Sequence, residues 1–170
     1  MAIRYLYPIP EPIYIPPDLP EGFKIDPELE AKLKADARPF EAFIKDLGNH
    51  QIFTRPKGQE QWDAILLALE ERAARREKEP DQPDYLALPG AAAEILKTCV
   101  NEPMFLMMVE NEQGPTPTWV RGLPFFPRQV RAFRPFIEAI KASKDVKPAR
   151  NKPSLVEVPA EATESEKQTG

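Results

Sequence analysis

The segment RGLPFFPRQVRAFRPF, residues 121–136, combines the two residue types that bind single-stranded nucleic acid. Arginines contact phosphates, and aromatic rings stack on unpaired bases. Residues 121–152 hold nine basic and two acidic residues. One hypothesis is therefore a nucleic-acid-binding accessory protein, or one that binds another anionic partner, through Arg121, Arg128, Arg131 and Arg134.

The same segment also fits an amphipathic helix with its Phe side chains in the core and its Arg side chains toward water or toward an acidic surface. The whole chain has a net charge of -4. Dedicated nucleic-acid binders usually carry a basic domain. This charge therefore favours the amphipathic helix, and the nucleic-acid function is kept as the alternative.

Nucleophilic and metal chemistry have few candidate residues in this chain. His50 is the only histidine and follows a predicted helix end, where a polar loop residue is the ordinary explanation. Cys99 is the only cysteine and lies on the apolar face of a predicted helix, as a small core residue would. No glycine-rich phosphate loop occurs. We therefore predict no catalytic residue, metal site or cofactor, and an enzyme that uses a carboxylate pair ranks last.

An apolar, proline-rich arm spans residues 1–20, with IRYLYPIPEPIYIPPDLP at positions 3–20. Proline fixes its own φ and pushes the preceding residue toward extended geometry, so an extended arm is expected. A free linker would not expose so many large apolar side chains. The arm is therefore predicted to lie in a groove of another protein, with contacts from Tyr5, Tyr7, Ile9, Ile13 and Tyr14.

Residues 21–143 are predicted to form a small, mainly α-helical domain. Apolar residues at helical spacing indicate helices over 59–79 and 90–101 and a kinked helix over 127–143. The run MFLMMVE at 104–110 permits one short β-hairpin with TWVRGL, and its methionines are interpreted as core filling. Residues 144–170 have the composition of a disordered tail.

A short phrase occurs twice, RPFEAFIK at 38–45 and RPFIEAIK at 134–141, and the copies agree at five of eight positions. A true internal repeat would extend beyond eight residues, and the flanking sequences do not match. Proline at the start of a helix and Phe in its first turn explain the similarity better. Each copy therefore predicts the beginning of a helix.

Together these features favour a non-enzymatic protein-protein interaction protein that docks through its N-terminal arm. An assembly factor, an adaptor or an accessory subunit of a larger complex, as in virion or tail assembly, has this organisation. Without an apolar run of membrane-spanning length or a secretory signal, we expect a cytoplasmic protein with no membrane partner. The hypothesis also predicts that the helical body stays folded when residues 1–20 are removed; the oligomeric state is left open.

Overall fold

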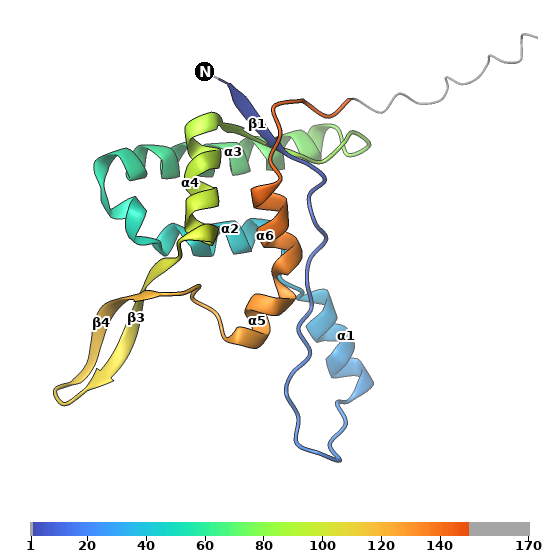
Figure 1. Ribbon diagram of the computed structural model, residues 1–170. Coiled ribbons are helices and arrows are strands. Elements are labelled where there is room, and N and C mark those ends of the chain that lie inside the picture. The colour runs from blue at the N-terminus through green and yellow to red at the C-terminus, as the bar shows by residue number, and fades with distance from the viewer. Residues whose placement is uncertain (1, 150–170) are drawn as a thin grey trace, which may run out of the picture.

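The computed structural model describes residues 2–149 and contains both helices and strands (Figure 1). Of this part of the chain, 49% is helical and 20% is extended in strands or bridges. The prediction of a mainly α-helical domain is therefore wrong, because the fold is an α/β mixture with two small antiparallel sheets. The predicted disordered tail lies outside the described residues from position 150 onward.

The first sheet joins two segments far apart in the sequence. Strand β1 (Ile3–Leu6) pairs antiparallel with β2 (Leu86–Pro89), so that Leu6 lies opposite Leu86. Strand β1 belongs to the predicted arm. The sequence did not predict this strand, because its pairing partner is about 80 residues away along the chain. The second sheet is the hairpin of β3 (Met104–Asn111) and β4 (Gly114–Arg121), which extends away from the body in Figure 1.

The helices begin where the sequence provides proline or a chain turn. Proline occupies the first turn of α1 (Pro27–Ala35), α3 (Pro56–Lys78), α5 (Pro127–Ala132) and α6 (Arg134–Lys141), where the missing N–H costs nothing. Helix α2 (Phe40–Asp46) follows Pro39 and continues into short 3-10 turns at Leu47–Asn49 and Gln51–Thr54. Helix α4 (Gly90–Asn101) directly follows β2.

The core lies between α2, α3, α4, α6 and the first sheet. Phe43 of α2 is at its centre, with ring centroids 5.6 Å from Phe125, 5.4 Å from Phe133 and 5.3 Å from Phe136. The two copies of the repeated phrase meet here, because Phe40 contacts Phe136 at 5.3 Å. Each copy begins a helix, and its aromatic residues pack into the same cluster.

The N-terminal arm lies on its own body. After β1, the arm forms backbone hydrogen bonds between Ile13 and Arg38, and Tyr5 exchanges backbone hydrogen bonds with Lys144. Leu6 is 1% exposed and belongs to the core. The arm and residues 144–149 are therefore packed against the folded domain over part of their length.

Candidate functional site

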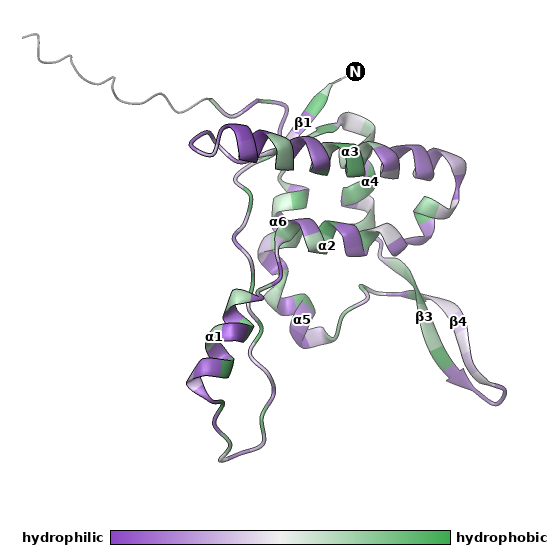
Figure 2. Ribbon diagram, turned by 180° about the vertical axis from the view of Figure 1, so that it is seen from behind, coloured by the Kyte–Doolittle hydropathy of each residue, from purple (hydrophilic) through white to green (hydrophobic). Residues whose placement is uncertain are grey.

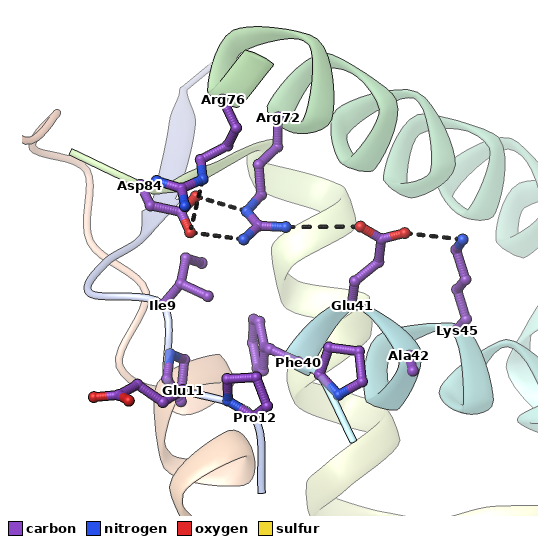
Figure 3. A pocket seen from close by; sticks show the side chains of 12 residues that line it. Ile9, Glu11, Pro12, Phe40, Glu41, Ala42, Lys45, Arg72, Arg76 and Asp84 are labelled. Carbon is purple, nitrogen blue, oxygen red and sulfur yellow. Dashed lines mark hydrogen bonds and ion pairs between the residues drawn. The ribbon is translucent and has the colours of Figure 1, made fainter. Parts of the chain in front are cut away.

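A cleft of about 510 Å³ lies between the arm and two helices. Figure 3 shows the side chains of Ile9, Pro12 and Phe40 on one side and a row of charged groups on the other. The arm, the beginning of α2, the C-terminal half of α3 and the segment before β2 each contribute part of its wall. This cleft could not be predicted from residue order, because its walls come from segments that are distant along the chain.

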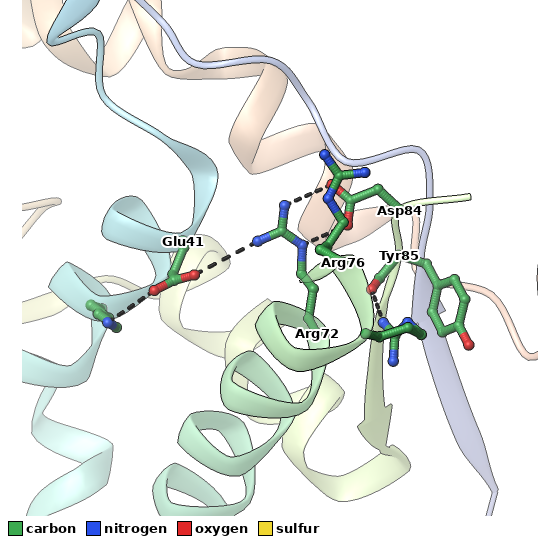
Figure 4. A network of polar contacts seen from close by, with 7 residues as sticks. Glu41, Arg72, Arg76, Asp84 and Tyr85 are labelled. Atoms are coloured by element: carbon green, nitrogen blue, oxygen red, sulfur yellow. Dashed lines mark hydrogen bonds and ion pairs between the residues drawn. The ribbon is translucent and has the colours of Figure 1, made fainter. Parts of the chain in front are cut away.

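Arg72 holds the charged side of the cleft together. Its Nε and one terminal nitrogen donate to the two carboxylate oxygens of Asp84 at 2.7 and 2.6 Å, and its other terminal nitrogen lies 3.6 Å from Glu41 (Figure 4). Arg76 lies 3.7 Å from Asp84, and Lys45 lies 3.0 Å from Glu41. The hydrogen bond to Asp84 raises the pKa of the Arg72 guanidinium above its ordinary value.

This network connects elements and leaves little free charge for chemistry. Glu41 is on α2, Arg72 on α3 and Asp84 before β2, so one guanidinium joins three segments. The carboxylates of Glu41 and Asp84 both lie against the guanidinium of Arg72. An acid-base pair needs its two carboxyl groups in different environments, and here both face the same cation. We interpret the network as a brace along the charged wall of the cleft, where it ties α2, α3 and the segment before β2 together.

His50 uses both ring nitrogens, one to cap a short turn and the other to bond the end of α4. Nδ1 accepts a hydrogen bond from the Ile52 N–H at 3.0 Å, so the proton is on Nε2, which donates to the Glu102 carbonyl at 2.8 Å. The ring also meets Phe105 edge-on at 5.0 Å. The only histidine thereby holds the 3-10 turn at Gln51–Thr54 against the base of the hairpin.

Cys99 is completely buried in α4, and burial raises the pKa of its thiol from the ordinary 9.0 to about 12. A thiolate is the reactive form, so the native protein should react slowly with a thiol reagent at about pH 8. Because the unfolded thiol ionises near pH 9 and the folded one near pH 12, its stabilising contribution is complete below about pH 9 and is lost as pH rises through this interval.

We expect native labelling of Cys99 to follow the rate of unfolding, and labelling in denaturant to be immediate. A reagent that reacts equally fast with native and denatured protein would show that the thiol is accessible.

The five predicted arm residues are placed mainly against the body. Tyr7 is 45% exposed, whereas the other four are half-buried. Tyr5 packs edge-on against Tyr85 at 5.6 Å, and Ile9 and Ile13 pack against the core. This placement removes the main reason for assigning the arm to another protein's groove, because four of the five predicted side chains are already partly covered by the chain's own body.

The four predicted arginines are all exposed, and none forms an ion pair within the described part of the chain. Their aromatic neighbours Phe133 and Phe136 are buried, and Phe125 stacks on Phe43. Phe126 is the exposed ring of the segment. The arginines are therefore available to an anionic partner, while most of the rings are committed to the core.

The hairpin carries the apolar surface that sequence reasoning missed. Leu106 pairs with Trp119 and Met108 with Pro117, and directly opposed residues share one face of a sheet. Leu106 is 49% exposed and Met108 65%, so the interpretation of the methionines as core filling does not hold for Met108. Figure 2 shows the apolar character of β3 continuing outward from the body. We call the side chains of Leu106, Met108, Pro117 and Trp119 the hairpin face.

Comparison of the chain with protein-family models, curated proteins and solved structures finds no match. Within residues 2–149, no group of three or more His, Cys, Asp and Glu side chains is placed to hold a metal ion. None of the helices in this part of the chain has the length and apolar character needed to cross a membrane. The surfaces that remain to be considered are the braced cleft, the four exposed arginines and the hairpin face.

Proposed function

We propose that the protein is a non-enzymatic interaction protein, an adaptor or assembly factor, that binds another protein through the hairpin face. The observation that carries this proposal is the exposure of Leu106, Met108 and Trp119 together on strands that extend away from the body. Contiguous exposed apolar side chains rimmed by polar residues are typical of binding surfaces. Methionine and tryptophan are also enriched in protein-protein interfaces.

The cleft and much of the arm have internal partners, which supports the choice of the hairpin over these two surfaces. The charged groups of the cleft pair with one another around Arg72. In the arm, Leu6 belongs to the core, and Ile9, Ile13 and Ile15 pack against it. The hairpin face differs because Leu106, Met108 and Trp119 all remain partly in water, and covering their apolar area with a partner would be favourable.

The proposal is tested by replacing Leu106 and Trp119 together with threonine. Threonine suits a strand, so the hairpin should persist while the apolar face is lost. We expect affinity purification from the native source to recover a set of proteins with the wild type and to lose it with the double variant. For a single purified partner, loss of a central apolar contact should weaken binding about 30-fold or more.

Val109→Thr is the matched control, because Val109 is also exposed but lies on the opposite side of the same strand. It should leave partner recovery unchanged. Equal recovery with the wild type and the Leu106→Thr/Trp119→Thr variant, both folded by circular dichroism, would contradict the proposal.

A further inference from the structure

The two edges of the hairpin differ in their hydrogen-bonding groups. In β4, Pro115 lies opposite Glu110 and Pro117 opposite Met108. Residues of a hydrogen-bonded antiparallel pair exchange two N–H···O bonds, which proline cannot do. These pairs are therefore non-hydrogen-bonded, and their backbone groups point outward. The outer edge of β4 thus lacks two donors, whereas the outward N–H groups of Met108 and Glu110 remain on β3.

The β3 edge is open along its outer half. At its base, Phe105 is buried and is bridged to His50. Beyond Leu106, no backbone hydrogen bond from elsewhere in residues 2–149 reaches this edge. Within this open part, residues 107–109 contain no charge, proline or glycine, and Glu110 is its one charged residue. An apolar edge of this kind is prone to pair with another strand. A two-stranded hairpin is also marginally stable alone and gains from a third strand.

We propose that a second copy of this chain covers this edge. The two β3 strands pair antiparallel across a two-fold axis near Val109 and form a four-stranded sheet in the order β4–β3–β3–β4. This inference rests on the proposed function in taking the hairpin as the interaction element. The strand edge binds the second copy, and the hairpin faces of both copies are left for the outside partner.

A second copy of this chain fits the open edge better than a strand of another protein, because a symmetric pair leaves no open β3 edge. Each chain has one open edge and one edge limited by proline, so a two-fold pair uses both open edges. Both outer edges of the resulting sheet are then β4, with Pro115 and Pro117 restricting further addition. A strand from another protein would leave its own far edge to be protected.

The charges of the hairpin are complementary under this symmetry. Its outer half carries Glu110 and Glu112, whereas Arg55 and Arg121 line a small cleft at its base, together with the carboxylate of Glu102. Antiparallel pairing places the acidic tip of one hairpin beside the basic base of the other. Parallel stacking of the two hairpins would instead bring the acidic tips together, which is unfavourable.

The oligomeric state of the full chain tests the proposal. By sedimentation equilibrium, we expect the wild type to reach twice the 19.3 kDa of one chain and to dissociate on dilution. Met108→Pro removes the outward donor on each copy but no β3–β4 hydrogen bond, and should weaken the dimer about 100-fold. Met108→Ala also shortens the side chain but keeps the N–H, and should retain more of the dimer than Met108→Pro.

Exchanging the charges of Glu112 and Arg55 gives a second test of the dimer, and this test does not depend on how well Met108→Pro folds. Glu112→Arg and Arg55→Glu should each weaken the dimer, and the double variant should restore it. A wild type that stays monomeric at its highest workable concentration overturns the inference, as does a folded Met108→Pro protein that dimerises like the wild type.

The two proposals fail in different ways. A monomeric protein whose partner is lost in Leu106→Thr/Trp119→Thr keeps the proposed function and excludes the dimer. The opposite result is a dimer that Met108→Pro weakens, together with partner recovery that Leu106→Thr/Trp119→Thr leaves unchanged. That result would exclude the proposed function and support the dimer.

Discussion

Replacing Leu6 with alanine is expected to lower the free energy of unfolding by about 2–5 kcal/mol. Leu6 ends β1 opposite Leu86 and is 1% exposed within the core. The substitution removes buried methyl groups and leaves a cavity that the surrounding helices fill only in part. Chemical denaturation followed by circular dichroism measures the change.

Tyr7→Ala is the matched control, because the next side chain along the arm is exposed. It should change the free energy of unfolding by less than about 0.5 kcal/mol. Equal effects of Leu6→Ala and Tyr7→Ala would contradict the placement of the arm. The same structure reverses the expectation for removal of residues 1–20, since deletion takes away Leu6 and a whole strand of the first sheet. We now expect that truncation to destabilise the domain severely.

Gly58→Ala is expected to destabilise the protein by about 3 kcal/mol, although helix propensity alone predicts the opposite sign. Gly58 lies in the first turn of α3, where alanine is intrinsically better by about 1 kcal/mol. However, a Cβ at this position would lie 2.0 Å from the carbonyl oxygen of Ile52. That oxygen belongs to the backbone of the preceding turn, so helix and turn would have to separate.

Gly48→Ala provides a graded comparison. Its Cβ would meet the ring of Trp62 at 2.3 Å, but this obstacle is a side chain that can rotate. We therefore expect a smaller loss for Gly48→Ala than for Gly58→Ala in thermal or chemical unfolding. A neutral or stabilising Gly58→Ala substitution would show that the turn at Gln51–Thr54 does not lie this close to α3.

Parts of the candidate site were predictable from residue order. The run at 104–110 permitted a short hairpin with TWVRGL at 118–123, and the arginines around α5 were expected to face outward if Phe133 entered the core. The hairpin face was missed because apolar residues on a strand look the same whether the body covers them or leaves them in water. Met107 packs against the core and Met108 is exposed, although they are adjacent in the same run.

The sequence by itself determined the local elements, because their causes are local. Apolar spacing and proline placement specify α3 and α4 within a few residues, and two Arg-Pro-Phe phrases each begin a helix. The tertiary structure decided what those elements touch. Three features depend on contacts between segments that are not neighbours in the sequence. They are the pairing of Ile3–Leu6 with Leu86–Pro89, the brace around Arg72, and the loss of stability expected for Gly58→Ala. Such contacts follow from packing the whole chain, which no short stretch of residues encodes.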